Sequence, residues 1–500
     1  MINVRSGGSV SGTDDRGAES ATIPAPVGAP RGSLAAWALV IVAAAQLMTV
    51  LDLAIVYVAL PSIQADLDIS TPNRQWVVSA YAIAFGGLLL LGGRLVDYFG
   101  RRRMFVTALV GFAVAAGIGG IAPTQEVLFG ARAVQGAFGA VITPAVLSLV
   151  SVTFTEKAER TRAFAVYGMV SGSGAAIGLI LGGVLTQFGS WRWCMLVNVP
   201  FALLIALAAV LVLPKDEPIV PTRYDIPGAI TATIGIAGLA EGFTLAGSHG
   251  WDSPYTVGTL VGAVLFVAVF LAIEARSAAP LLPLHIVTEY HRALLYAAAF
   301  LANAAQLSMF LFLTYYFQTT LDYSAVRTGF AFLPFALAVV LTGNLLGAPL
   351  ARVNPLNLMM VGAAACVLAL LALSRLNTAT FYPIGVMLPE ILMGFGVALS
   401  LFPLNNVVLA GIDPADAGVA SAAVSTTQQM GAALGNASLN TVFALGVAHF
   451  LARPGNADRV DDAAVHGYSL VFRWESGLYL AFLLLVLLVW RDSRRQPRAA

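Results

Sequence analysis

The sequence has 500 residues, of which 58% are hydrophobic and only 11% charged, and its formal net charge is +1. Its mean hydropathy is +0.83. Soluble domains carry about 25% charged residues, so this composition excludes a string of soluble domains, and the near-neutral charge gives no reason to expect a nucleic-acid partner. Most of the recurring apolar runs exceed the roughly 18 residues that a helix needs to cross the hydrocarbon layer. We therefore expect an all-α polytopic membrane protein surrounded by a lipid bilayer.

The chain starts with a polar segment and continues as a series of apolar runs. Residues 1–33 are rich in Gly, Ser, Pro and charge, which is typical of a disordered tail. Residues 491–500 form a second polar tail. Between them, apolar length and polar breaks predict about fourteen membrane-spanning helices, at 34–61, 74–95, 103–123, 126–152, 162–187, 192–213, 226–247, 254–275, 292–317, 327–350, 356–374, 380–403, 416–449 and 470–490.

These spans divide into six, two and six. We expect a six-helix bundle over 34–213, a linker with two extra spans over 214–291, and a second six-helix bundle over 292–490. A weak internal echo supports a repeat, since "GGRLVDYFGRRR" and "GAPLARVNPLN" follow the second helix of each bundle. Transporters often consist of two repeated bundles with the substrate site between them, near the membrane midplane.

Basic residues gather in alternate loops. Short loops with Lys and Arg stay on the cytoplasmic side. The loop after span two holds Arg101, Arg102 and Arg103, and several of the other even-to-odd loops are also basic. This bias predicts a multi-pass protein of the inner (plasma) membrane with both termini, and hence both tails, in the cytoplasm.

The string "GGRLVDYFGRRRMF", residues 92–105, is the most specific motif. Gly93 would let the helices approach closely, Asp97 could cap the next turn or pair with an arginine, and Gly100 would permit a tight turn. The plainer interpretation is a basic loop with a turn glycine. The spacing resembles the G-x-L-x-D-x-x-G-R signature of the major facilitator superfamily. By that resemblance, Gly93, Asp97, Gly100 and Arg101 would form a conformational latch between the bundles.

Other stretches are similar to the fourteen-span drug:proton antiporters of the EmrB/QacA type. "LDLAIVYVALPSI" resembles their helix-one motif, with Ala54 and Tyr57 in place of the usual Thr and Asn. "ARAVQGAFGA" resembles their helix-four motif, whose buried arginine is Arg132 here. The helix-five motif departs from the family because "GLILGG" lacks its proline. The resemblance implies the major facilitator fold, with two extra helices between the bundles, and a role for Arg132 in proton coupling.

Four ionisable groups inside spans are candidates for proton coupling: Asp52, Arg132, Glu241 and Glu390. An Asp at a helix centre costs roughly 2.5–3.5 kcal/mol on insertion scales, so such groups are functional hypotheses by default. Asp52 could bind a proton in one access state and a cation in the other, or could make a structural hydrogen bond to a neighbouring helix. Arg132 could instead pair with backbone carbonyls, and Glu241 could equally be structural.

Polar and aromatic residues on spans nine and thirteen could line a cavity for an amphipathic ligand. These candidates for a substrate cavity are Asn303, Gln306, Tyr315, Gln428 and Gln429. For each of them, helix–helix packing is at least as good an explanation.

The leading hypothesis is a monomeric exporter of small amphipathic or cationic compounds, as in multidrug efflux, with the proton gradient as energy source and no cofactor. The chain has no G-x-x-x-x-G-K-[ST] motif, which disfavours an ATP pump. An exporter of one metabolite or antibiotic would show the same motifs. A membrane enzyme is disfavoured because the five histidines, which lie in loops or at helix ends, form no metal or nucleophile constellation. A channel is disfavoured by the two-bundle plan.

Overall fold

The computed structural model describes residues 33–154, 156–214, 225–277, 287–345, 353–410, 412 and 417–495. All regular elements in these ranges are helical. The predicted N-terminal tail, except Ser33, and residues 496–500 lie outside the described residues, as does most of the polar linker 214–225. Residues 346–352 also lie outside them, so the internal echo at "GAPLARVNPLN" is described only in part.

The N-terminal half forms one bundle of helices. Its helices are α1 (Ser33–Asp66), α2 (Trp76–Phe99), α3 (Arg101–Gly120), α4 (Gln125–Thr153), α5 (Lys157–Phe188), α6 (Arg192–Leu196) and α7 (Asn198–Val212). Helices α6 and α7 together make one span, Arg192–Val212. Two helices follow this bundle as a hairpin, α8 (Ile226–His249) and α9 (Pro254–Glu274).

The C-terminal half forms the second bundle. Its helices are α11 (Tyr290–Tyr315), α12 (Ala325–Ala331), α13 (Leu333–Leu345), α15 (Pro355–Leu373), α16 (Leu388–Leu409), α17 (Ala417–Leu451) and α18 (Val460–Arg495). Short π-helical turns, η1 (Tyr316–Thr320) and η2 (Pro383–Met387), extend α11 and precede α16. The last helix begins ten residues before the expected start at 470 and runs beyond the expected end at 490.

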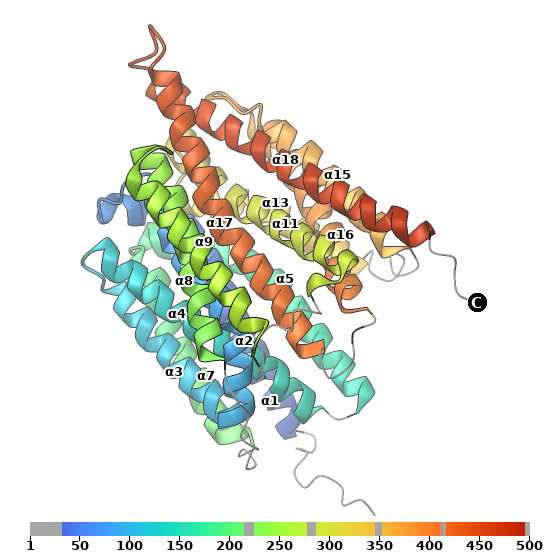
Figure 1. Cartoon of the computed structure of the whole chain (residues 1–500). Coiled ribbons are helices and arrows are strands. Elements are labelled where there is room, and N and C mark those ends of the chain that lie inside the picture. The colour runs from blue at the N-terminus through green and yellow to red at the C-terminus, as the bar shows by residue number, and fades with distance from the viewer. Residues whose placement is uncertain are drawn as a thin grey trace, which may run out of the picture.

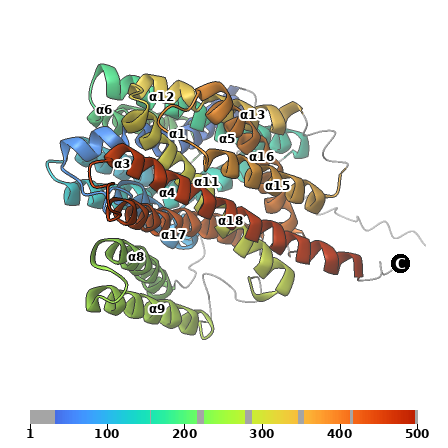
Figure 2. The same cartoon turned by 90° about the horizontal axis from the view of Figure 1, so that it is seen from above.

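Figure 1 shows the two bundles side by side, with the hairpin of α8 and α9 next to α17. Seen from above in Figure 2, this pair stands outside both bundles. Helix α8 packs on α2 and α17, while α9 packs on α8 and is otherwise largely exposed. In the described residues, thirteen helices are long and apolar enough to cross a membrane, and Gly174–Phe188 of α5 is a shorter apolar stretch. The all-helical fold is confirmed, with the two extra helices between the bundles in the order of the sequence.

We call the end where α1 passes into α2 the expected outer end, and the end where α2 passes into α3 the expected inner end, after the orientation predicted from the basic loops. The bundles touch at the expected outer end. The Gln318 side chain donates to the Val58 carbonyl at 2.8 Å, and the Val326 amide donates to the Gln187 side chain at 3.1 Å. Helix α5 also packs against α12 and α13 across the two bundles.

Candidate functional site

Asp52 on α1 and Arg132 on α4 form an ion pair inside the N-terminal bundle. The Arg132 Nη1 atom lies 2.7 Å from Asp52 Oδ2, and both side chains are fully buried. The two residues are separated by 80 positions in the sequence. Asp52 therefore has a counter-charge in this arrangement of the helices, supplied by Arg132.

Two side-chain amides complete the surroundings of the Asp52 carboxylate. Asn198, at the start of α7, donates to Asp52 Oδ1 at 2.8 Å, and Gln135 on α4 donates to the same oxygen at 3.3 Å. Arg132 also donates to Gln135 Oε1 at 3.0 Å. Helices α1, α4 and α7 thus supply one hydrogen-bonded polar cluster, which satisfies a carboxylate that burial would otherwise disfavour.

The Arg132 guanidinium is held from α2 as well. Its Nε atom donates to the Val77 carbonyl at 3.1 Å, and its carbon lies 4.7 Å from the centroid of the Tyr81 ring. Helix α2 can come this close because Gly136 on α4 has no side chain: a Cβ there would lie 2.3 Å from the Tyr81 carbonyl oxygen. The glycine next to Gln135 therefore allows the helix contact that positions Arg132.

The two residues that depart from the helix-one motif lie on different sides of α1. Ala54 faces α5, where a Cβ at Gly178 would come within 2.7 Å of the Ala54 Cβ atom, so this position leaves room only for a small side chain. Tyr57 faces the other bundle, with its ring 6.0 Å from that of Phe310 and its hydroxyl near Asn436. The helix-one substitutions therefore alter a helix contact and the bundle interface, while the Asp52 carboxylate keeps its four-residue cluster.

The other two carboxylate candidates are not in this cluster. Glu390 lies in the first turn of α16 in the C-terminal bundle; it is fully buried, and neither carboxylate oxygen has a hydrogen-bond partner among the described residues. Glu241 is half-buried on α8, near the Trp76 indole of α2. The structure brings Asp52 and Arg132 together and leaves these two glutamates at separate places.

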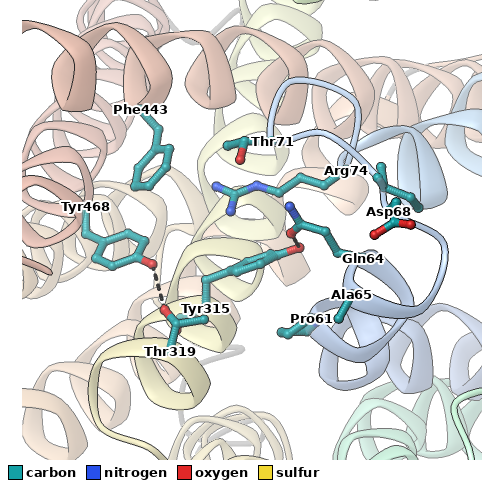
Figure 3. A pocket seen from close by; sticks show the side chains of 11 residues that line it. Pro61, Gln64, Ala65, Asp68, Thr71, Arg74, Tyr315, Thr319, Phe443 and Tyr468 are labelled. Carbon is teal, nitrogen blue, oxygen red and sulfur yellow. Dashed lines mark hydrogen bonds between the residues drawn. The ribbon is translucent and has the colours of Figure 1, made fainter. Parts of the chain in front are cut away.

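Of the five predicted cavity residues, Tyr315 lines a described cavity. Its hydroxyl donates to Gln64 of α1, and the cavity, of about 570 Å³, lies beside both residues (Figure 3). Asn303 instead donates to the Ala299 carbonyl of its own helix. Gln306, Gln428 and Gln429 are partly buried and line neither of the described cavities.

The latch motif lies at the expected inner end. Gly100 has a φ of 98°, a conformation that favours glycine, and it ends α2 and begins α3 in one tight turn. Gly93, Asp97 and Arg101 line a cavity of about 410 Å³ between α2, α4 and α17, and Asp97 is exposed.

The expected role of Gly93 in close helix approach is wrong by one position. A Cβ at Gly93 would meet only the Pro144 Cβ atom, at 3.8 Å, an ordinary contact, whereas a Cβ at Gly92 would lie 2.2 Å from the Ala140 carbonyl oxygen. Gly92 faces α4 and Gly93 faces the cavity, so the close helix contact depends on Gly92.

Three buried polar residues were not among the candidates predicted from the sequence. Asn198 is a polar residue in the apolar run 192–213, and no motif quoted above includes it. Arg74 lies at the expected start of the second span, and the structure buries it between the bundles. Glu475 on α18 is fully buried, with no partner for its carboxylate oxygens in the described part of the chain. No group of three His, Cys, Asp or Glu side chains that could hold a metal ion occurs among the described residues.

Comparison with known proteins agrees with this architecture. The family model described as Major Facilitator Superfamily matches residues 42–436. The puromycin resistance protein pur8 of Streptomyces alboniger is 43% identical over 468 residues, which are 92% of each chain. The cephamycin export protein CmcT of Amycolatopsis lactamdurans is 39% identical over 418 residues, covering 83% of this chain and 86% of that protein.

A solved structure supports the fold alone. The human organic anion transporter MFSD10 superposes with a TM-score of 0.59 and 16% identity, over 90% of this chain and 99% of that one. Taken with the two-bundle architecture and the family match over most of the sequence, these similarities identify the chain as a member of the Major Facilitator Superfamily, and so as a membrane transporter and not an enzyme.

Proposed function

We propose that this protein is a proton-coupled exporter of small amphipathic compounds that works by alternating access in the plasma membrane, with both termini in the cytoplasm. The observation that supports it best is the buried Asp52–Arg132 ion pair in a major facilitator fold. A buried carboxylate beside a permanent cation is a group whose protonation changes the local charge balance strongly.

Protonation of Asp52 would leave the Arg132 cation without its counter-charge. Removing one partner of a buried pair is destabilising by roughly 3–5 kcal/mol in measured cases. A proton entering along the membrane potential releases about 2.3 kcal/mol per 100 mV. These energies are similar in size, so proton binding at Asp52 can shift the balance between two arrangements of the helices that hold the pair. Asn198 and Gln135 would hold the carboxylate in place in the unprotonated arrangement.

The names of the relatives favour antibiotics as substrates. One is named for puromycin resistance and another for cephamycin export. Each name refers to one compound, which favours a second candidate function, the export of a single antibiotic or metabolite on the same fold. Uptake of puromycin, of a cephalosporin and of cationic dyes into inverted vesicles separates the two: a broad exporter moves several of them, and a narrow one moves a single compound.

Other sequence candidates take secondary roles in this proposal. Glu390, which is buried in the second bundle without a hydrogen-bond partner among the described residues, would bind a further proton. Glu241, half-buried on α8, would at most couple protons within the α8–α9 hairpin. Asp97 and Arg101 would form the latch, which opens and closes the cavity at the expected inner end. The protein would act as a monomer in this proposal.

Substrate-induced proton release from the purified protein tests the proposal. Wild-type protein should release protons when an exported compound is added, and Asp52→Asn should release fewer while keeping its elution profile in size-exclusion chromatography. Asp66→Asn is a matched control, because Asp66 is a half-exposed carboxylate at the end of the same helix, paired with Arg192 at 2.6 Å. Undiminished proton-driven transport by Asp52→Asn would rule out the proposed mechanism. Glu390→Gln in the same assay tests the secondary proton site.

A further inference from the structure

A second buried arginine, Arg74, lies at the expected outer end beside a cavity of about 570 Å³ (Figure 3). Residues of both bundles line this cavity, including Gln64 of α1, Tyr315 of α11, Phe443 of α17 and Tyr468 of α18. Ala65 and Asp68, which also line it, are exposed, so the cavity opens to solvent at its rim. It is separate from the Asp52–Arg132 cluster and from the latch.

Aromatic rings and one amide position the Arg74 guanidinium. Its carbon lies 3.9 Å from the centroid of the Tyr315 ring and 4.8 Å from that of Phe443. Its Nε atom donates to Asn440 Oδ1 at 3.0 Å, and only 3% of the residue is exposed. Figure 3 shows the guanidinium above the Tyr315 ring, on the cavity side of the α1–α2 loop. Side chains of the C-terminal bundle thus hold this arginine, which belongs to the N-terminal half, in a fixed orientation.

The charge of Arg74 has no counter-ion in the described part of the chain. Arg132 pairs with Asp52, Arg192 with Asp66 and Arg459 with Asp462. Asp68 lines the same cavity but forms no ion pair with Arg74, and the Arg74 Nη2 atom is buried without any acceptor. A buried cation with an unsatisfied donor is unfavourable unless an acceptor is supplied.

We propose that the Arg74 cavity is a binding site for an organic carboxylate with an apolar, preferably aromatic, body. The Arg74 guanidinium would bind the carboxylate in a charge-assisted hydrogen bond. The apolar body would contact Phe443 and Tyr468. Polar side chains that also line the cavity, such as Gln64 and Thr319, would contact polar substituents of the ligand. The proposal concerns binding, and it does not require that the ligand be transported.

Protection of an introduced cysteine against alkylation tests the site without altering Arg74. Ala65→Cys places a thiol at the exposed rim, and the native Cys194 and Cys366 are fully buried, so background labelling should be low. The probe is 2-naphthoate, compared with neutral 2-naphthylmethanol and cationic 2-naphthylmethylamine. Saturating naphthoate should slow labelling, and neither analogue should slow it at the same concentration. Equal protection by the neutral or cationic analogue, or no protection by naphthoate, would overturn the proposal.

Two arginine variants in the Ala65→Cys background assign the effect to one residue. Arg74→Gln should raise the naphthoate concentration that gives half-maximal protection by about tenfold or more. The reason is that a hydrogen bond to a charged group contributes about 1.5–3 kcal/mol. Arg327→Gln is the matched control: Arg327 also stacks on an aromatic ring, Tyr323 at 3.7 Å, but it is exposed and lies outside this cavity. Unchanged protection in the Arg74→Gln variant would mean that another residue binds the carboxylate of the ligand.

A separate arm of the same experiment distinguishes two sources of the carboxylate ligand, the bilayer and the aqueous phase. Dodecanoate, a fatty acid, would reach the site from the bilayer, and naphthoate would reach it from water. Protection by both supports a carboxylate site open to lipid-derived ligands, and protection by naphthoate alone supports one that selects soluble aromatic acids. Protection by dodecanoate alone would contradict the aromatic preference. Because the assay contains no proton gradient, its failure leaves the proposed export function untouched, and the Asp52→Asn variant should still bind naphthoate.

Discussion

The contact between Asp52 and Arg132 combines two groups that the sequence marked separately. It also admits a purely structural explanation, in which the pair only holds α1 to α4. A variant that lacks one partner and a variant that lacks both distinguish proton coupling from a purely structural role. Asp52→Ala leaves a buried, unpaired guanidinium and should lower stability by about 3–5 kcal/mol, whereas Asp52→Asn with Arg132→Gln removes both charges and should restore much of it.

Thermal unfolding in detergent and transport in proteoliposomes measure the two outcomes. We expect the double variant to unfold close to the wild-type temperature and to transport nothing, because the group that binds the proton is gone. Loss of the exposed Asp66–Arg192 pair should cost at most about 1 kcal/mol and serves as the reference. Proton-driven transport by the stable double variant would mean that the pair has only a structural role.

Asn198 is the least expected member of the cluster, and it gives a sharper test because it carries no charge. Its amide donates to the Asp52 carboxylate at 2.8 Å. Asn198→Ala should lower the rate of proton-driven transport by about tenfold or more, since a hydrogen bond to a charged group contributes about 1.5–3 kcal/mol. Asn357→Ala is the control: that amide accepts from the Trp490 indole at 2.8 Å, near the ends of α15 and α18, and its loss should leave transport largely unchanged.

Among the helices, α5 explains how a motif without its proline can still pack tightly. Gly178 and Gly182 place α5 directly on α1, and Gly183 places it on α12 of the other bundle. A Cβ at Gly182 would lie 2.7 Å from the Ile55 carbonyl oxygen, a backbone atom of a buried helix that cannot move alone. Small residues of this kind are the usual means of close helix approach in membranes.

Gly182→Ala is therefore expected to destabilise the N-terminal bundle by about 1–3 kcal/mol, the usual range for overpacking. Gly130→Ala on α4 is a matched change, because nothing lies within 4 Å of a Cβ there. In that variant only the gain in helix propensity remains, about 0.5–1 kcal/mol. The two variants should thus shift the melting temperature in opposite directions, as measured by fluorescence-detected size-exclusion chromatography after heating. A Gly182→Ala protein as stable as Gly130→Ala would contradict the close contact between α1 and α5.

Sequence patterns predicted the number of spans, their grouping and the turn at Gly100, because apolar length and glycine conformation are local properties. The partners of buried charges could not be predicted in the same way. Asp52 and Asn198 are separated by 146 positions, and only the packing of α1 and α7 brings them together. The same limit produced the error at Gly93, because a helix turns by about 100° per residue and a one-position shift changes the neighbour.

At the scale of the whole molecule, the contacts between the two bundles at the expected outer end constrain the transport cycle. Gln187 at the end of α5 accepts from the Val326 amide at the start of α12, beside the close approach of Gly183 to Ala325. These elements belong to different bundles, so alternating access requires them to separate once in each cycle.

A reducible cross-linker between two introduced thiols tests this requirement. Gln187→Cys with Val326→Cys, linked by a short bis-methanethiosulfonate, should lose transport, and a reducing agent should restore it, because only the motion of the bundles is blocked. Each single variant, treated in the same way, should keep its transport. If the reagent cannot cross membranes and still links the pair in intact cells, this end faces outward, as the basic loops predict. Full transport by the linked protein would mean that the bundles do not part between α5 and α12, and that access alternates by a different motion.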